Sequence, residues 1–508
     1  MFKLIDYKLY SFFLIILLSS CAKNPVSGMP DFVTITEQQE IEMGRAYHKE
    51  ILKNSKILKN KEINKYYVEL GEKIAKISHR PDLQWKFTII DDPTFNAFAT
   101  PGGYVYMYRG LLAHFNSEAE LAGVLSHEIA HITARHAVRG MSAAQVTNLL
   151  IGLAASRVPG GSISNSGFNL LNQVINKGYS RKYESESDEI AKEYLGKNGY
   201  NQNAMSNFLE TMKNADELEK DIAKREGRPA SGGYHGIFST HPSTENRIEA
   251  MNKTVSKSGK KNRNEFLKMI DGLPYGSSDD EGYVRHNIFY HPFFAIKFTF
   301  PETWELKNLP DKLIIKKKTS EIKLISDNLL RDDIDNGLTP KDYLDQNVDK
   351  TSFLSKNDIL EQKPIQKNKM SGYTYLYETK SLGNKVFTRY SVFFDIEDNG
   401  KKPKAWIFIK KMDDINDDNE SKIIEQSFTK MTKEEIKKSK GLRIKVVRFR
   451  DGMTYKELAD NSPLGRYAEG RLRLLNGHYP DKKPQVGSLI KIVEWLWKEI
   501  YFMHNLVE

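Results

Sequence analysis

The sequence predicts a multidomain α+β protein, and three observations point to this fold class. The chain has 508 residues, more than one hydrophobic core usually holds, so two to four domains are expected. In the first half, apolar residues recur with the helical period of about 3.6 residues. From Phe289 onward they alternate with a period of two, and a short stretch near the C-terminus predicts a small β-α-α-β unit.

The composition is that of a globular protein. Hydrophobic residues make up 39% of the chain and the mean hydropathy is −0.55, which excludes a bundle of membrane helices. The formal net charge is +10, and a basic surface can face anionic phospholipid or cell-wall polymer. The alternative is a lysine-rich solvated surface, because the basic runs are short and acidic residues lie between them.

Residues 1–20 have the pattern of an export signal. Lys3 and Lys8 flank an apolar start, the run Leu9–Leu18 carries no charge, and small residues follow it before Cys21. The run is too short to span a bilayer, which takes about 20 residues. We therefore expect an exported chain in which residues 21–35 form a tether.

The end of this signal resembles a bacterial lipobox, in which the cysteine is lipidated and becomes the new N-terminus. Cys21 is the only cysteine of the chain, and a lone cysteine in an exported protein would otherwise be a reactive thiol. The resemblance implies a periplasmic protein anchored by lipid at Cys21, with the outer membrane favoured over the inner membrane. The alternative is an ordinary signal with a chance cysteine.

Residues 36–255 are predicted to form a mostly helical domain with a small sheet. Helical periodicity covers about 35–76, and strands are expected at 87–90 and 104–108. A long helix is expected to begin at Asn116 or Ser117, because SEAE over 117–120 has the spacing of a capping box. Helical patterns then resume near Ser180.

The rest of the chain divides at changes of period and composition. Strand patterns and a helix near 421–431 predict an antiparallel sheet with a helix packed against it. The expected divisions are a linker at 256–285, the sheet domain at 286–432, a charged linker at 433–441, the β-α-α-β module at 442–494 and a tail at 495–508.

The segment 127–131 reads HEIAH and is the strongest functional signal in the chain. On a helix, His127 and His131 lie four residues apart on one face, so both imidazoles can reach one metal ion. Zinc favours neutral imidazole nitrogens. Glu128 lies on the adjoining face and can accept a proton from water without coordinating the metal. The segment therefore predicts a zinc hydrolase.

A catalytic zinc also needs a third protein ligand and an open position. No third histidine follows at the short spacing that metzincins have, so a carboxylate on a later helix is expected. In YSRKYESESD over 179–188, the best candidate is Glu184. Asp188 shares its helix face and is placed to accept the spare N–H of a ligand histidine. Glu186 and Glu189 are expected to point elsewhere, and the alternative for the whole segment is an acidic solvated face.

These motifs, together with NAFATPGG over 96–103, resemble the gluzincin metallopeptidases of the HtpX, Oma and CAAX-prenyl-protease type. The BepA-like periplasmic branch is the most similar, and the resemblance covers about residues 24–255. It implies one zinc ion per chain with the ligands His127, His131 and Glu184. It also implies Glu128 as general base and Asp188 as a supporting group or proton donor.

The resemblance further implies a substrate-binding edge strand and a latency switch. Substrate backbone is expected to pair with the strand formed by Asn96, Ala97, Phe98 and Ala99. In BepA-like proteins a histidine that corresponds to His241 can occupy the open zinc position and hold the enzyme latent. The alternative for His241 is a loop residue ahead of a helix. His136 is expected to turn away from the metal as a surface or structural residue.

The module at 442–494 resembles a LysM module. Its first helix is expected to open with TYKE over 454–457 as a capping box, and its second to close with LLNG over 474–477. Met453 stands where that family usually has aspartate. The resemblance implies binding to peptidoglycan, and the alternative is a purely structural cap.

Together these patterns predict a zinc-dependent endopeptidase of the cell envelope. It is expected to cleave exported proteins that are misfolded or stalled, by attack of activated water with Glu128 as general base. The alternative is a lipid-anchored chaperone or scaffold with latent proteolysis. The expected cofactor is one Zn²⁺ per chain. The expected partners are polypeptide substrates, the membrane and peptidoglycan, with no nucleic acid.

Overall fold

The computed structural model describes residues 21–154, 178–226, 241, 245–254, 258–276, 282–285, 287–309, 312–317, 320–348, 359–367, 370–381, 384–396, 402–438 and 441–495. The expected signal at 1–20 and all but the first residue of the expected tail lie outside these ranges. The chain forms two compact units, of which the first combines the residues up to 276 with 442–495 and the second comprises 277–441. Helices and sheets together, with a separate sheet-rich region, confirm the predicted α+β class.

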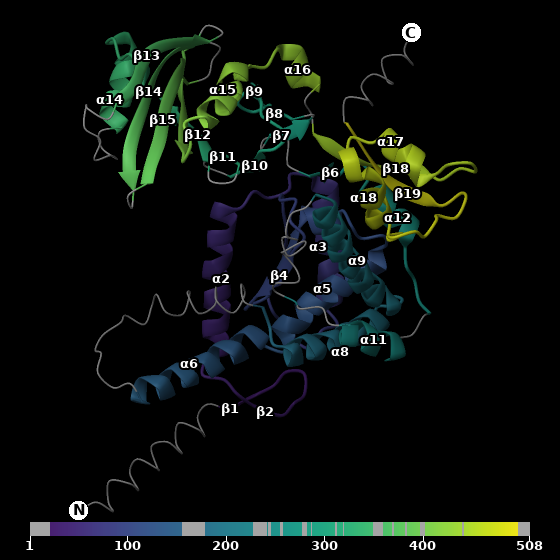
Figure 1. Ribbon diagram of the computed structural model, residues 1–508. Coiled ribbons are helices and arrows are strands. Elements are labelled where there is room, and N and C mark those ends of the chain that lie inside the picture. Colours follow the sequence, from purple (N-terminus) through teal and green to yellow (C-terminus); the bar gives the residue numbers. More distant parts are fainter. Residues whose placement is uncertain are drawn as a thin grey trace, which may run out of the picture. The chain divides into compact units, whose positions relative to one another are not determined.

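In the first unit, helix α5 (Glu118–Thr133) carries the HEIAH segment and packs against α3, α8 and α9 (Figure 1). Ser117 is its N-cap, because its Oγ accepts a hydrogen bond from the N–H of Glu120 at 3.3 Å. The Glu120 carboxylate reaches back to the N–H of Asn116 at 2.6 Å. In the predicted capping box the Glu120 carboxylate would accept a hydrogen bond from the N–H of Ser117. It accepts one from the N–H of Asn116 instead, one residue earlier.

The remaining helices of the first unit outside the C-terminal module are α2 (Glu37–Asn54), α3 (Lys61–Ala75), α4 (Arg109–Leu112), α6 (His136–Ala154), α8 (Arg181–Lys197), α9 (Asn203–Glu226), α11 (Glu245–Thr254) and α12 (Arg263–Met269).

A three-stranded sheet lies beside α5. Its strands are β3 (Lys86–Ile90), β4 (Ala97–Thr100) and β5 (Tyr104–Tyr108), in the order β3-β5-β4. Strand β5 runs parallel to β3 and antiparallel to β4. The turn between β4 and β5 uses Gly102 and Gly103 at φ values of 81° and 102°, which only glycine adopts readily. Among the described residues β4 pairs with β5 alone, so it is the predicted edge strand.

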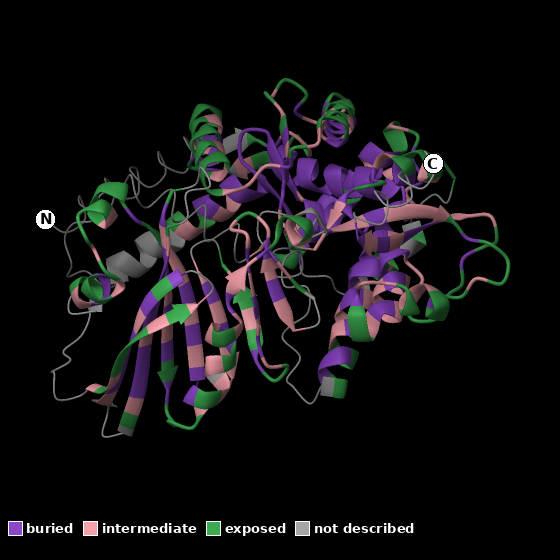
Figure 2. Ribbon diagram, turned by 90° about the horizontal axis from the view of Figure 1, so that it is seen from above, coloured by how far each residue is buried: buried purple, intermediate pink, exposed green. Residues whose placement is uncertain are grey.

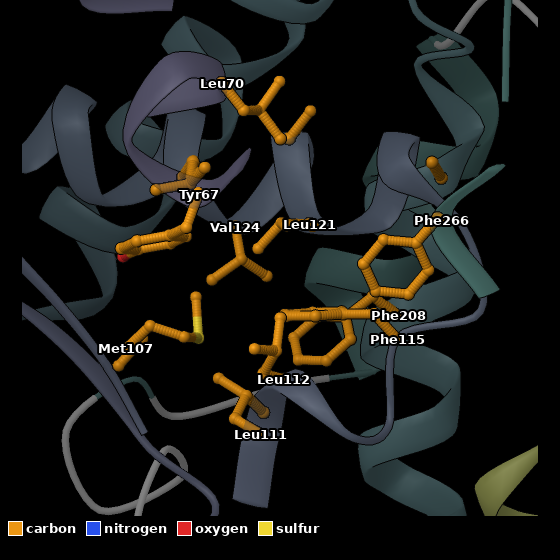
Figure 3. Close-up of a cluster of buried hydrophobic side chains, with 14 of the residues drawn as sticks. Tyr67, Leu70, Met107, Leu111, Leu112, Phe115, Leu121, Val124, Phe208 and Phe266 are labelled. Carbon is orange, nitrogen blue, oxygen red and sulfur yellow. The ribbon is translucent and has the colours of Figure 1, made fainter. Parts of the chain in front are cut away.

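The core of the first unit surrounds α5 on all sides. Every residue of α5 after Glu118 is buried (Figure 2). Figure 3 shows Leu121 and Val124 packed among Tyr67, Phe115 and Phe208. A helix that is buried all round must be largely apolar or small on every face, as its sequence EAELAGVLSHEIAHIT is. The polar groups of HEIAH therefore need protein partners or a ligand.

A buried ion cluster holds the C-terminal end of α5. Glu40 of α2 is 1% exposed. It accepts hydrogen bonds from Arg80 at 2.6 Å and from Arg135 at 2.8 Å. Arg80 also donates to the carbonyl of Ile132 in the last turn of α5, at 3.2 Å. Both guanidinium groups pair with the Glu40 carboxylate, so these charge-assisted bonds fix the helix end without leaving a buried charge unpaired.

The C-terminal module has the predicted β-α-α-β order. Its elements are β18 (Leu442–Arg448), α17 (Tyr455–Asp460), the 3₁₀ turn η2 (Gly465–Tyr467), α18 (Ala468–Leu475) and β19 (Leu489–Trp495). The capping box predicted at 454–457 is present, with Thr454 and Glu457 as its two members. The module packs with the first unit, in place of the separate C-terminal unit that we expected.

Two segments expected as linkers pack into the first unit. Residues 21–35 form a hairpin of β1 (Cys21–Lys23) and β2 (Pro30–Phe32), after which Val33 and Ile35 are buried. Within the expected linker 256–285, α12 buries Phe266 and Leu267 in the core. Strand β6 (Pro274–Tyr275) then pairs with β18. The apolar residues of these two segments make the contacts with the core. The segments are too short for their apolar pattern to predict that they are buried.

The second unit is the sheet-rich region. Its main sheet is antiparallel with seven strands in the order β10-β11-β12-β16-β15-β14-β13, and a four-stranded sheet has the order β17-β9-β8-β7. Strands β8 and β9 form a hairpin, with a turn at 292–295 between them. The expected charged linker contains the short helix α16 (Lys433–Lys438).

The strands of the second unit are β7 (Tyr283–Arg285), β8 (Ile288–His291), β9 (Ile296–Thr299), β10 (Glu305–Asn308), β11 (Leu313–Lys317), β12 (Ser320–Asn328), β13 (Ile359–Lys367), β14 (Met370–Ser381), β15 (Asn384–Asp395), β16 (Lys404–Met412) and β17 (Thr429–Lys430). Its other helices are α13 (Arg331–Asp335), α14 (Pro340–Val348) and α15 (Asp417–Ser427), the last of which covers the predicted helix near 421–431 in part. No helix in the described part of the chain has the length and hydropathy needed to cross a bilayer.

Candidate metal centre

Helices α5 and α8 bring three predicted ligands together. Helix α8 begins after Ser180, whose Oγ accepts a hydrogen bond from the N–H of Tyr183 at 3.3 Å. Its first turn then carries Glu184 toward α5. Glu184 Oε1 lies 3.4 Å from His131 Nε2, and Glu184 Oε2 lies 3.5 Å from His127 Nε2. The two Nε2 atoms lie 3.0 Å apart. All three side chains are buried.

His241 completes the group. Its Nδ1 lies 3.0 Å from Glu184 Oε1 and 3.3 Å from His127 Nε2, and its side chain is buried. One ligand atom from each of His127, His131, Glu184 and His241 lies within 4.8 Å of the other three. Glu184 is buried, which differs from the acidic solvated face that was the alternative for its segment. His241 lies ahead of α11 and also beside the other three donor residues.

The four donor atoms fit a zinc ion. Three imidazoles and one carboxylate are ligand types that zinc favours, and four donors around one point suit its tetrahedral preference. Without an ion, the buried carboxylate of Glu184 would have to be balanced by hydrogen bonds and positive charge alone. If His127, His131 and Glu184 stay bound to the metal, a position for water opens only when His241 is displaced.

Glu128 lies next to the donor group without belonging to it. Its side chain is buried, and its carboxylate oxygens have no hydrogen-bond partner among the described residues. His241 lies beside it, with its Nε2 3.4 Å from Glu128 Oε1. Burial raises the pKa of Glu128 above its ordinary value. This geometry is suited to accepting a proton from a water molecule at the site.

Asp188 supports the ligand His127. Its Oδ1 lies 3.1 Å from His127 Nδ1, so it can orient the imidazole with Nε2 toward the metal position. Burial would raise the pKa of Asp188, but the hydrogen bonds from Arg247 and the nearby His127 hold this pKa below its ordinary value. An ionised Asp188 is an acceptor, which favours the supporting role over the proton-donor role that we had left open.

Arg247 is a site residue that the sequence did not identify. It lies on α11, and its Nε and Nη2 donate to the two oxygens of Asp188, both at 2.7 Å. Its Nη1 lies 2.8 Å from Glu184 Oε2. One guanidinium therefore joins a predicted ligand to the group that orients another. Arg247 follows His241 by six residues in STHPSTENR, the signal from which it could have been inferred.

His131 has its own supporting residues. His136, expected as a surface or structural residue, is fully buried, and its Nδ1 lies 2.9 Å from His131 Nδ1. Its Nε2 lies 3.3 Å from Glu186, which also pairs with Arg139. Tyr179 stacks on the His131 ring at a centroid distance of 4.1 Å. Glu186 thus points away from the metal position, as predicted, and still belongs to its surroundings.

The other predicted site residues lie near or apart from this group. Strand β4, with Ala97, Phe98 and Ala99, contacts α5, and Asn96 precedes it. The carbonyl of Asn96 accepts the N–H of Tyr108 at 2.9 Å. Cys21 lies at the start of β1 and is not among the residues that form the candidate metal centre.

Comparison with known proteins identifies the domain that holds this group. The chain is 32% identical over 246 residues to a Vibrio cholerae protein named as a beta-barrel assembly-enhancing protease, covering 46% of this chain and 48% of that protein. It is 30% identical over 229 residues to the mitochondrial metalloendopeptidase OMA1 of Schizosaccharomyces pombe, covering 44% and 63%. Against the Escherichia coli beta-barrel assembly-enhancing protease the identity is 26%, covering 44% and 45%.

The chain thus spans about half to two thirds of the length of these relatives. The model of Peptidase family M48 matches residues 61–255, which include α5, α8, α11 and all four donor residues. Residues 61–255 therefore form a metallopeptidase domain of Peptidase family M48.

Proposed function

We propose that this protein is a zinc-dependent endopeptidase of the cell envelope that cleaves exported proteins. The observation that carries the proposal is the convergence of His127, His131 and Glu184 beside the buried carboxylate of Glu128. The family match and the relatives named as metalloendopeptidases and as assembly-enhancing proteases support it. Misfolded or stalled chains are the proposed substrates, because an edge strand pairs most readily with an unfolded backbone.

In the proposed mechanism, the substrate backbone pairs with the free edge of β4 and is held beside α5. His127, His131 and Glu184 would hold a zinc ion, which would supply Lewis-acid chemistry at the scissile carbonyl and at a water molecule. Glu128 takes the proton from the attacking water and passes it to the leaving amine. Asp188 and Arg247 keep His127 and Glu184 in place throughout.

The C-terminal module is proposed to act as a structural cap rather than as a glycan-binding unit. Its helix α18 packs against α9, and its apolar residues belong to the core that surrounds α5. A module that shares its core with another domain cannot move independently of it. These contacts favour the structural alternative of the two that its LysM-like sequence left open.

Replacing Glu128 by glutamine separates an enzyme from a scaffold. We expect Glu128→Gln to keep one zinc per chain, while cleavage of an unfolded substrate such as casein falls at least about a hundredfold, because the general base is lost. His127→Ala and His131→Ala should lose the metal. Zinc content by atomic emission and casein cleavage measure both effects.

The matched control is Glu189→Gln on α8, whose side chain is 65% exposed and forms an ion pair with Lys192. It should keep metal and activity within about twofold. Equal turnover by wild type and Glu128→Gln would favour the scaffold alternative instead.

Replacing Arg247 tests the support of the ligands. Arg247→Gln removes three charge-assisted contacts from Glu184 and Asp188, so we expect the zinc affinity to fall about 10- to 100-fold in a chelator competition. Lys253→Gln on the same helix is the control, because that side chain is 69% exposed. An Arg247→Gln protein with wild-type zinc affinity would show that the guanidinium is dispensable for the site.

Replacing His241 tests latency. We propose that its imidazole takes the fourth position at the metal and excludes the catalytic water. If about a tenth of the molecules are open at rest, His241→Ala should cleave casein about tenfold faster, with zinc content unchanged. The gain should disappear in the double variant with Glu128→Gln. Unchanged or lower activity in His241→Ala would assign His241 a structural role or a part in catalysis.

Replacing Cys21 tests the proposed lipid anchor at the outer membrane. After export, we expect most of the wild type in the membrane fraction and most of Cys21→Ser in the soluble fraction, because acyl chains supply the stable attachment. Ser27→Ala, at an exposed position of the same hairpin segment, should behave as wild type. If Cys21→Ser stays with the membranes, the basic surface or the C-terminal tail is the anchor.

A further inference from the structure

Lysine 491 connects the C-terminal module to the segment that leads into α5. It lies on β19 and is fully buried. Its Nζ donates hydrogen bonds to the carbonyl of Ala113 at 2.9 Å and to the carbonyl of Phe115 at 2.7 Å. Both carbonyls belong to the short connection between α4 and α5. A residue 376 positions away in sequence from Phe115 therefore satisfies the backbone just before the metal-site helix.

The backbone of Lys491 is itself fixed. Its N–H donates to Asn476 Oδ1 at 2.7 Å, and its carbonyl accepts from Asn476 Nδ2 at 2.8 Å. Asn476 is the C-cap of α18 and also donates to the carbonyl of Leu472 at 2.9 Å. Hydrogen bonds between β19 and the C-terminal end of α18 thus fix the backbone from which the Lys491 side chain extends.

Arg263 provides a second connection at the same place. Its Nη1 donates to the carbonyl of Asn116 at 2.6 Å, and its Nη2 donates to the carbonyl of Leu489 on β19 at 3.0 Å. Glu120, in the first turn of α5, lies near Lys491, and its charge opposes the fall in the pKa of Lys491 that burial causes. Phe115 thus binds Lys491 of the module, and Glu120 attracts the same lysine. Asn116 binds Arg263, which in turn binds Leu489 of the module.

The apolar contacts have the same arrangement. Ile444 and Val493 of the module lie in one core with Leu121 and Val124 of α5. Ile444 also exchanges backbone hydrogen bonds with the segment after α12, through Gly272 at 2.8 Å and Leu273 at 2.9 Å. Figure 3 shows Phe115 and Phe266 in the same cluster as Leu121 of α5.

We propose that Lys491 is a positioning residue for the metal centre, through which the C-terminal module fixes the N-terminal end of α5. The first histidine, His127, follows the N-cap by ten residues, about 15 Å along the helix axis. A helix transmits a shift at its end to its side chains because its backbone is rigid. The module is then a required part of the peptidase and not an appended binding domain. This inference rests on the proposed zinc site.

The test is Lys491→Met in the full chain, which keeps the side-chain length and removes the donor. We expect zinc affinity in a chelator competition to fall about tenfold, and kcat on casein to fall about tenfold with KM within twofold. Measurements are made well below the unfolding midpoint, so that a loss of stability alone does not change them. In the metal-free protein, amide exchange across 113–121 should be faster. Lys483→Met, an exposed position on the same module, is the matched control.

The outcomes are distinguishable. Wild-type zinc affinity and kcat in a folded Lys491→Met protein would overturn the inference, even if its unfolding midpoint were lower. If Lys491→Met does not fold, Arg263→Gln decides. Lower zinc affinity in that folded variant supports the inference, and unchanged affinity overturns it. A wild-type protein that binds no zinc would contradict the proposed function itself, whereas equal zinc binding by wild type and Lys491→Met would contradict only this inference.

Discussion

Burial of the helix that carries the metal ligands is the constraint on which the rest of the first unit depends. Helix α5 exposes almost nothing to solvent, yet it holds two histidines and a glutamate in its C-terminal half. Transfer of such groups out of water costs several kcal/mol each, on the order of 2–7 kcal/mol for a polar group without a partner. The surrounding elements must therefore supply hydrogen bonds, charges or a ligand at defined points, and they leave little freedom in how the helix is placed.

The charges around the centre are arranged to meet that cost. Arg247 joins Asp188 and Glu184, so two buried carboxylates share one guanidinium. On the other side, His136 and Glu186 extend from His131 toward Arg139. Only Glu128 has no hydrogen bond to its carboxylate among the described residues. The site thus holds the ligands and Asp188 by hydrogen bonds and ion pairs, and it leaves the buried carboxylate of Glu128 free of hydrogen bonds among the described residues.

Both ends of α5 are fixed by residues remote in sequence. The Glu40 cluster holds the last turn through Arg80 and Arg135. Lys491 and Arg263 hold the connection ahead of the first turn. A helix constrained at both ends can keep two imidazoles and a carboxylate in register with α8, because neither end can fray or slide. The N-terminal hairpin, α12 and the C-terminal module consequently form one core with the peptidase helices.

The sequence by itself determined the chemistry of this protein, because that chemistry depends on local spacing. Residues four apart on a helix share a face whatever surrounds them, so His127 with His131 and Glu184 with Asp188 could be paired from the sequence alone. Edge strand β4 was expected for a different reason, because NAFATPGG over 96–103 resembles a segment of the gluzincin metallopeptidases. The α+β class followed from the change of apolar period near Phe289.

The tertiary structure alone decided which distant segments complete the site and the core. Arg247 and His136 acquire their roles only when α11 and α6 pack beside the ligands, since nothing within their own segments requires a partner. The expected tether at 21–35, residues 258–276 of the expected linker and the module at 442–494 pack within the first unit through long-range contacts. Short apolar segments carry no period long enough to show that they are buried. A buried lysine such as Lys491 is recognisable only once the carbonyls that it binds are in place.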